Sequence, residues 1–434
     1  MLFKDITIVD ENYQEQKHMN ILVEGNKITY IGKEFPKNYK GEIYDGTNKA
    51  AVPGYFNAHC HVPMTLMRGY GEGLPLDRWL FEKIFPFEDL MSDDDNYWGS
   101  MLGIAEMISS GCASFSDMYM HSKAIIKAVE ESGIKANISR SCSAFSDDVH
   151  YRDLLAYEEM NYLYDYMKSA DNDRIIADTS IHAEYTTKPT LVREVAEYTK
   201  ERGLMLQVHI SETEKEHREC KERYGMTPTQ WMKSLGIFDN KVTAAHCIYC
   251  EDADLEIFKE SGTSVVHNPT SNLKLGSGIL NITNMINKGI NVCIGTDGAS
   301  SNNNLNMHEE INLASILQKG INKNSEMYGP SEMFKISCKN GAISQGRMDC
   351  GSLKVGNRAD IVIYDLDKPH LYPVYDTLAT LMYSAAASDI CLNMVDGKVL
   401  YKNGEYTTID IEKAKFNANR IRDEKLAELS KTKK

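Results

Sequence analysis

Short apolar runs alternate with amphipathic stretches over most of the chain. Strands are predicted at residues 52–59, 112–118, 136–141, 175–182, 204–210, 241–246, 263–267 and 291–296. The stretches between them carry helix signals: one opens at Pro189 and stops at Gly203, and another, 121–132, stops at Gly133. Strand and helix alternating eight times predict an α/β fold, a (β/α)8 barrel of the TIM type.

The two ends of the chain show a different pattern. Residues 19–32 contain two alternating runs separated by Gly25-Asn26, which predicts a β-hairpin. Strand patterns return at 359–364 and 392–401, and the last segment is charged and favours helix. Residues 1–52 and 346–410, from the two ends of the chain, are predicted to form a small β-sandwich domain. Residues 53–345 are predicted to form the barrel, and residues 411–434 a helical tail.

Composition and charge exclude several classes of protein. Hydrophobic residues make up 42% and charged residues 25%, and no apolar run approaches the roughly 18 residues of a membrane helix. For lack of such a run, no membrane is an expected partner. The net charge of −14 leaves no basic field for a polyanion, so nucleic acid is not an expected partner either. The N-terminal residues lack a signal-peptide pattern, which favours a cytoplasmic location. Assembly into a homo-oligomer is left open.

The ten cysteines are scattered through the chain. They lack the spacing of a small disulfide scaffold, so reduced thiols are expected. Cys247 and Cys250 form a CxxC pair, but no second pair of similar spacing follows. A structural zinc site would need that second pair.

Polar side chains stand at the ends of four predicted strands, where a barrel of this type has its active site. The first strand ends in His59 and His61, and residues i and i+2 share one face of a strand. His209, His246 and Asp297 end the fifth, sixth and eighth strands. Imidazoles and a carboxylate suit one divalent ion, zinc first and iron as the alternative. One HxH pair alone could be structural, but four strand ends together favour a metal site.

This arrangement resembles the amidohydrolase superfamily, which has HxH on strand 1, His on strands 5 and 6, and Asp on strand 8. The resemblance covers nearly the whole chain and includes the sequence segments at 53–59, 267–272 and 353–360. Binuclear members carry a carboxylated lysine on strand 4, whereas this strand ends in Ser180-Ile181-His182. The resemblance therefore implies one metal ion per chain, held by His59, His61, His209 and Asp297.

The resemblance also implies a reaction. The spacing from His209 to Glu212 (HxxE) marks the deaminase branch, in which a ring nitrogen is protonated before ammonia leaves. In this scheme Glu212 donates the proton, Asp297 takes a proton from the attacking water, and His246 stabilises the developing hydroxide. The alternative for Glu212 is a solvated loop charge.

The loop at residues 63–88 resembles that of the 5-methylthioadenosine/S-adenosylhomocysteine deaminase family. The resemblance implies an adenine nucleoside as substrate, with Trp79 and His182 contacting it and Glu88 binding the ribose hydroxyls. Loops of this length at a barrel mouth commonly bind substrate. Trp79 could instead serve only in loop packing, and Glu88 could be a solvated charge.

Two arginines follow the third predicted strand. Arg140 and Arg152 match the family's arginines that hold the amino-acid carboxylate of S-adenosylhomocysteine, and a planar guanidinium suits a carboxylate. Two other interpretations stay open. Arg140 could pair with an acidic neighbour, and Arg152 could be a surface charge on a helix.

The chain departs from the family in one place, because the stretch between the fifth and sixth strands is longer than expected. It carries an inserted helix-like segment around Cys220 to Leu235. The functional alternatives are deamination of adenosine, 5′-deoxyadenosine, guanine, cytosine or an s-triazine, and a catalytically silent scaffold. The complete set of metal and proton-transfer residues argues against a silent scaffold.

Overall fold

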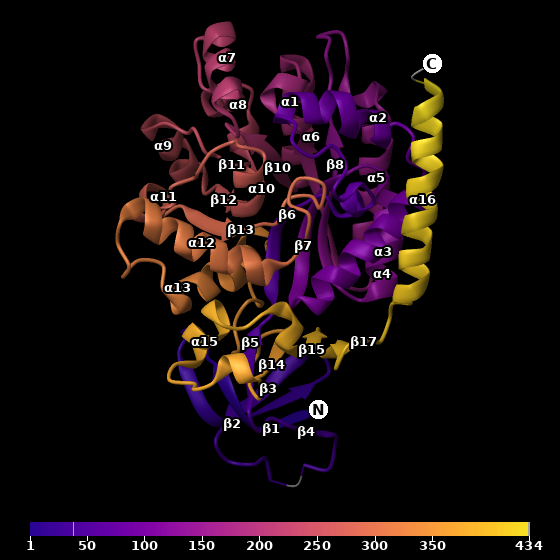
Figure 1. Cartoon of the computed structure of the whole chain (residues 1–434). Coiled ribbons are helices and arrows are strands. Elements are labelled where there is room, and N and C mark those ends of the chain that lie inside the picture. Colours follow the sequence, from indigo (N-terminus) through magenta and orange to yellow (C-terminus); the bar gives the residue numbers. More distant parts are fainter. Residues whose placement is uncertain (38, 433–434) are drawn as a thin grey trace.

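The computed structural model describes residues 1–37 and 39–432. Eight parallel strands lie in sequence order in one sheet. They are β6 (Tyr55–Cys60), β7 (Cys112–Tyr119), β8 (Lys135–Cys142), β9 (Ile175–Ile181), β10 (Met205–Ile210), β11 (Lys241–His246), β12 (Ser264–His267) and β13 (Asn291–Ile294). The N–H of Asp297, just after β13, donates to the carbonyl of His59 in β6 at 3.0 Å, so the two edges meet. The predicted (β/α)8 barrel is confirmed (Figure 1).

Seven predicted strands agree with the observed ones within one or two residues, but the first, at 52–59, was wrong in its extent. The chain forms two strands there, β5 (Lys49–Pro53) in a second sheet and β6 in the barrel. Gly54 separates them. A Cβ on Gly54 would lie 2.6 Å from the Cβ of Ala113 in β7, so the backbone passes too close for a side chain.

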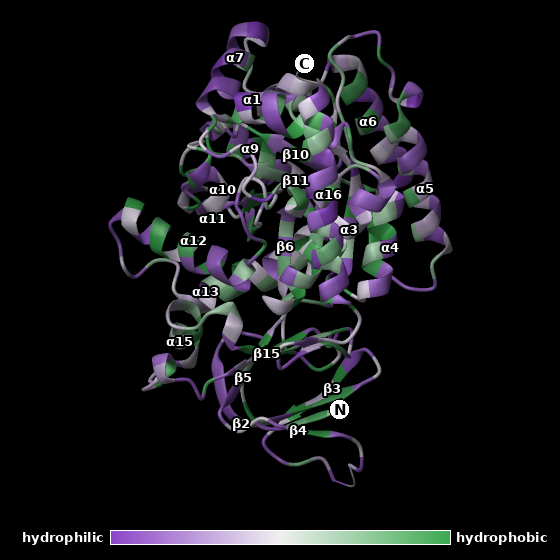
Figure 2. Ribbon diagram, turned by 45° about the vertical axis from the view of Figure 1, so that its right-hand side comes forward, coloured by the Kyte–Doolittle hydropathy of each residue, from purple (hydrophilic) through white to green (hydrophobic). Residues whose placement is uncertain are grey.

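Helices surround the barrel and turn their apolar faces toward it (Figure 2). The longer ones are α3 (Asp93–Ser109), α4 (Ser122–Ser132), α5 (Leu155–Ser169), α6 (Pro189–Arg202), α7 (Glu214–Tyr224), α9 (Asp252–Ser261) and α12 (Met307–Asn322). As predicted, α4 stops at Gly133 and α6 at Gly203, both with positive φ. The segment around Cys220 to Leu235 is not one helix. It spans the end of α7 and α8 (Pro228–Ser234), separated by a turn at Gly225, where φ is 67°.

Shorter helices follow the ends of several barrel strands. The loop after β6 contains a 3-10 helix (Val62–Met67), α1 (Leu76–Trp79), a π-helical turn (Leu80–Ile84) and α2 (Phe85–Glu88). Elsewhere the short helices are α10 (Pro269–Lys274), α11 (Thr283–Asn287), α13 (Pro330–Lys335), α14 (Gly341–Ser344) and α15 (Thr377–Tyr383).

Both chain ends contribute to a second, nine-stranded sheet. Its strands are β1 (Leu2–Val9), β2 (Glu15–Glu24), β3 (Lys27–Gly32), β4 (Ile43–Asp45), β5, β14 (Ile361–Asp365), β15 (Ile390–Val395), β16 (Lys398–Lys402) and β17 (Glu405–Tyr406). The predicted hairpin is present, with Glu24 opposite Lys27. Strands β5 and β14, far apart in sequence, pair directly, which joins the two ends of the chain. Whether the two sheets belong to separately folding domains stays a prediction.

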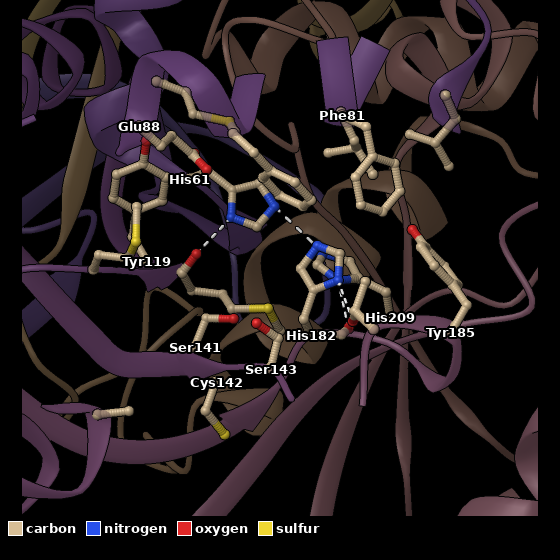
Figure 3. Close-up of a pocket in the computed structure, with 18 of the residues that line it drawn as sticks. His61, Phe81, Glu88, Tyr119, Ser141, Cys142, Ser143, His182, Tyr185 and His209 are labelled. Atoms are coloured by element: carbon tan, nitrogen blue, oxygen red, sulfur yellow. Dashed lines mark hydrogen bonds between the residues drawn. The ribbon is translucent and has the colours of Figure 1, made fainter. Parts of the chain in front are cut away.

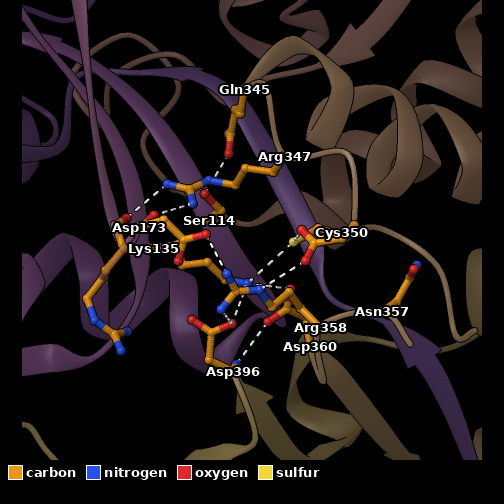
Figure 4. A network of polar contacts seen from close by, with 12 residues as sticks. Ser114, Lys135, Asp173, Gln345, Arg347, Cys350, Asn357, Arg358, Asp360 and Asp396 are labelled. Atoms are coloured by element: carbon orange, nitrogen blue, oxygen red, sulfur yellow. Dashed lines mark hydrogen bonds and ion pairs between the residues drawn. The ribbon is translucent and has the colours of Figure 1, made fainter. Parts of the chain in front are cut away.

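A buried charged network connects the barrel to the second sheet (Figure 4). The Lys135 ammonium, at the start of β8, donates to Asp360 at 2.6 Å and to Asp396 at 3.1 Å. Arg347 donates to the backbone carbonyls of Asp173 and Ala136. The charge of Lys135 is therefore compensated inside the protein by two carboxylates, whereas the acceptors named for the buried Arg347 are neutral carbonyl groups.

The C-terminal helix α16 (Ile411–Thr432) lies along α3 (Figure 1). Lys425 pairs with Asp95 at 3.1 Å, and Arg420 pairs with Asp94 at 3.0 Å. The final two residues of the predicted tail, 433–434, lie outside the described residues. Among the helices of the described ranges, none is both long and apolar enough to cross a membrane.

Candidate active site

A cavity of about 550 Å³ lies at the carboxyl ends of the barrel strands. This volume is in the range of small-molecule pockets, and the location is where barrels of this type have their active sites. Most of the residues selected from the sequence line it: His61, Trp79, Glu88, Arg140, His182, His209, Glu212, His246 and Asp297. Figure 3 shows His61, His182 and His209 pointing toward one another between the two walls of the cavity.

Backbone contacts fix the tautomers of two histidines. Nδ1 of His209 donates to the carbonyl of His182 at 2.7 Å, and Nδ1 of His61 donates to the carbonyl of Met118 at 2.6 Å. When these rings are neutral, each Nε2 therefore carries a lone pair and no proton. These Nε2 atoms lie 3.3 Å apart, and Nε2 of His209 is also 3.1 Å from Nε2 of His59. Lone pairs at such distances repel each other unless a cation lies between them.

Asp297 completes this cluster from the end of the eighth strand. Its Oδ1 lies 3.2 Å from Nε2 of His61 and 3.5 Å from Nε2 of His59. Its other oxygen accepts hydrogen bonds from Ser271 at 2.6 Å and Ser301 at 2.8 Å. Two serines therefore hold the carboxylate while one oxygen stays directed at the imidazoles. The donor set fits a divalent ion of the zinc type.

Burial sets the protonation of these groups. It lowers the pKa of His59 to about 4 and holds that of His209 well below its ordinary value, so both rings are neutral near pH 7. Burial also lowers the pKa of His61, but the Asp297 carboxylate outweighs this effect and raises it to about 9. For Asp297 burial acts to raise the pKa, yet the bonds to His59 and His61 bring it well below the usual range. A metal ion would take the place of the proton on His61.

Glu212 and His246 lie on one side of the cluster. Oε2 of Glu212 is 3.9 Å from Nε2 of His246, and Ser277 donates to Oε1 of Glu212 at 3.1 Å. Nδ1 of His246 donates to Oδ1 of Asn272 at 2.8 Å, which leaves Nε2 free to accept a hydrogen bond. Burial raises the pKa of Glu212, which favours the protonated form that a proton donor needs.

One supporting residue was missed in the sequence. Glu216, buried in the first turn of α7, accepts the N–H of Ser211 at 3.1 Å and the N–H of Glu212 at 2.8 Å. Ser211 has a positive φ of 47°, an uncommon conformation for a non-glycine residue. Glu216 therefore stabilises the turn that directs Glu212 into the cavity. The spacing of four residues between the two glutamates was the available signal.

The loop after β6 covers the cavity. Trp79 is buried at the end of α1 and lines the cavity, so it is not a solvent-exposed side chain. Burial raises the pKa of Glu88, which is hydrogen-bonded to Tyr119. Lys215 of α7 pairs with Asp77 of α1 at 2.7 Å, so the longer segment after β10 contacts this loop. The imidazole of His182 lies 5.0 Å from that of His209, measured between ring centroids.

Of the two predicted arginines, only Arg140 lines the cavity. Arg140, in β8, lines the cavity, but its Nε donates to Glu159 of α5 and its Nη1 to the carbonyl of Ser141. Arg152 is exposed in a 3-10 turn (Tyr151–Asp153) and does not line the cavity. A shared role for them in binding a carboxylate stays a prediction.

Fold and site together are those of a barrel hydrolase with a histidine-rich metal centre. The model of the Amidohydrolase family matches residues 50–400, and the chain belongs to this family. A 5-methylthioadenosine/S-adenosylhomocysteine deaminase of Thermoanaerobacter pseudethanolicus is 39% identical over 423 residues, covering 97% of this chain and 98% of the relative. A 5′-deoxyadenosine deaminase of Methanocaldococcus jannaschii is 40% identical over 402 residues, covering 92% and 94%.

Solved structures agree with this placement. An adenosine deaminase from Xanthomonas campestris with bound zinc is 26% identical and superposes with a TM-score of 0.92, covering 98% of each chain. A zinc complex of an atrazine chlorohydrolase from Arthrobacter aurescens has a TM-score of 0.89 at 21% identity, covering 97% of this chain and 99% of the other. The second likeness concerns the fold alone.

Proposed function

We propose that the protein hydrolytically deaminates an adenine nucleoside, giving the inosyl product and ammonia. The observation that carries this proposal is the buried Glu212 facing His246 beside converging imidazole lone pairs, within one cavity. The relatives named for deamination of 5-methylthioadenosine, S-adenosylhomocysteine and 5′-deoxyadenosine support it. The proposed substrate is a small nucleoside. The cytoplasmic location stays a prediction.

The proposed metal ligands are His59, His61, His209 and Asp297, with zinc as the ion. Bound zinc would supply Lewis acidity and lower the pKa of water toward neutrality. Asp297 then accepts a proton from the attacking water, and Nε2 of His246 accepts a hydrogen bond that orients it. Water adds to the ring carbon that carries the amino group, and the carbon–nitrogen bond breaks as ammonia leaves.

Glu212 supplies the acid step. Its carboxylic acid protonates the ring nitrogen beside the reacting carbon, which makes that carbon electrophilic. Its carboxylate then accepts the proton of the added hydroxyl group, while the proton held by Asp297 passes to the departing amine. Trp79 and His182 are proposed to contact the nucleoside, and Glu88 to bind the ribose hydroxyls. Arg140 is proposed to face the 5′ substituent.

The test is a deamination assay on purified protein, which follows the ultraviolet change and the ammonia released. The panel is adenosine, 5′-deoxyadenosine, 5′-methylthioadenosine, S-adenosylhomocysteine, guanine and cytosine. Deamination of one or more adenine nucleosides, with the free bases unaffected, is expected. Activity confined to guanine or cytosine would replace the proposal, and a metal-loaded protein inactive on the whole panel would overturn it.

A further inference from the structure

The CxxC pair of the sequence lies directly after His246 and takes no part in the proposed reaction. Cys247 and Cys250 follow the end of β11, and the two residues between them form a turn. The Cα atoms at the two ends of such a turn are less than about 7 Å apart. A disulfide joins Cα atoms that are about 4.4–6.8 Å apart, so the backbone already holds the pair within the range of a disulfide bond.

The two thiols of this pair differ in accessibility. All ten cysteines lie in the described ranges, and eight are buried, whereas Cys250 and Cys391 are partly exposed. Burial raises the pKa of Cys247 well above its ordinary value, and the nearby Cys250 thiol raises it further. A thiol that keeps its proton is a poor nucleophile. Cys250 is therefore placed to attack an oxidant first, and Cys247 to close the disulfide.

The turn between the cysteines also supports side chains of the proposed reaction. The N–H of Tyr249 donates to the carbonyl of Ser211 at 3.1 Å, and its hydroxyl donates to the carbonyl of Ser277 at 2.8 Å. The side chain of Ser277 donates in turn to Glu212. His246, at the start of this segment, has a φ of 72°, a strained conformation for a non-glycine residue. A covalent bond across the turn would therefore shift both His246 and Glu212.

We propose that Cys247 and Cys250 form a reversible disulfide, which slows deamination by displacing His246 and Glu212. The oxidant is a low-molecular-weight disulfide such as oxidised glutathione. The Cys250 thiolate attacks one sulfur atom of the oxidant, which forms a mixed disulfide and releases the first glutathione as a thiolate. Cys247 then attacks the Cys250 sulfur, its proton passes to solvent, and the second glutathione leaves. Two protein thiols are oxidised, and one glutathione disulfide is reduced to two thiols.

Oxidation of the metal-loaded protein tests the proposal. Protein equilibrated with oxidised glutathione should lose the mass of two hydrogen atoms, and peptide mapping should place the new bond between Cys247 and Cys250. We expect kcat on the preferred nucleoside to fall by about 10-fold to 100-fold, because small displacements of catalytic groups have effects of this size. Metal content should stay unchanged, and reduced glutathione should restore both the thiols and the activity.

Two serine variants identify the cysteines responsible. Cys250→Ser removes the attacking thiol, so its kcat should not respond to oxidised glutathione. Cys391→Ser is the matched control, because Cys391 is the other partly exposed cysteine and lies in β15 of the second sheet. This variant should lose activity on oxidation as the wild type does. Should Cys250→Ser fail to fold, the mass and the peptide map of the oxidised wild type decide.

Three results would overturn the proposal. They are a stable glutathione adduct on Cys250 without a bond to Cys247, a closed disulfide that leaves kcat unchanged, and loss of activity on oxidation of Cys250→Ser. The disulfide goes beyond the proposed function, whereas its effect on the rate rests on that function. A protein that deaminates no nucleoside before oxidation would contradict the proposed function, and the disulfide would then be judged from the peptide map.

Discussion

The two ends of the cavity are built differently. At the inner end, four of the proposed metal-binding and catalytic side chains have a second partner that holds them: a backbone carbonyl for His61 and for His209, an amide for His246, and two serines for Asp297. At the outer end, the side chains come from loops and from the start of α5, and Phe145 and Leu155 are largely exposed. The inner end is organised without a substrate, whereas large apolar side chains at the outer end stay exposed.

This difference indicates which end of the cavity carries the chemistry and which end sets the selectivity. Electrostatic catalysis requires groups that need little reorganisation, and strand ends in a closed barrel provide them. Selectivity for the 5′ substituent depends on side chains that can vary without disturbing the barrel. Substitutions at the inner end should therefore affect all substrates alike, and those at the outer end should affect substrates differently.

The largest effect is expected from His209. His209→Ala removes a proposed metal ligand whose Nε2 lies close to two other imidazoles, so the bound metal and the activity on every nucleoside should be lost together. Metal analysis and the deamination assay measure this. His18→Ala, an exposed histidine of the second sheet, is the control and should retain both. Wild type should hold one ion per chain, and two equivalents, with activity rising alongside the second, would contradict the mononuclear site.

Glu212→Gln should come next. The amide preserves the shape of the side chain but cannot deliver a proton, so kcat should fall by about 100-fold to 10,000-fold on all substrates. Metal content and nucleoside binding should be retained, as measured by metal analysis and by titration with the inosyl product. A variant that kept more than about a tenth of wild-type kcat would show that another group donates the proton.

Sequence reasoning located the inner end because its residues follow apolar runs of the barrel. Once the strands were aligned, the ends at His59, His209, His246 and Asp297 had to meet at one face. The predicted start of the first barrel strand was wrong because β5 (Lys49–Pro53) is apolar, and its pattern runs on into that of β6. Only the close approach at Gly54 shows where the chain leaves one sheet for the other.

The outer end and the supporting residues were harder to find. The contacts of Glu159 and Glu216 depend on how α5 and α7 are rotated and placed against the barrel, which a local pattern does not fix. The alternative that Arg140 pairs with an acidic neighbour was stated from the sequence, but the neighbour could not be named. Ser271 and Asn272 lie in the family-like segment at 267–272. Their hydrogen bonds to Asp297 and His246 could be assigned only from the fold.

A moderate effect is expected from Glu216, which links the inner end to α7. In Glu216→Gln one amide oxygen remains for two N–H donors, so one buried donor loses its partner at a cost of about 1–3 kcal/mol. The unpaired donor should loosen the turn that positions Glu212, so kcat should fall about ten-fold for every nucleoside, with KM changed less. Glu214→Gln, on the exposed side of the same turn, is the control. A change confined to thermal stability would limit Glu216 to a structural role.

The smallest effect is expected from Arg152, and it tests the outer end most directly. The side chain is exposed and outside the cavity, so Arg152→Met removes a solvated charge, and such changes are usually within about 0.5 kcal/mol. We therefore expect kcat/KM to change by about two-fold or less for both 5′-methylthioadenosine and S-adenosylhomocysteine. A loss restricted to S-adenosylhomocysteine would mean that the turn at Tyr151–Asp153 moves over the bound substrate and brings the guanidinium to its carboxylate. The outer end would then be assembled by binding, and the contrast between a fixed inner end and a ligand-organised outer end would become sharper.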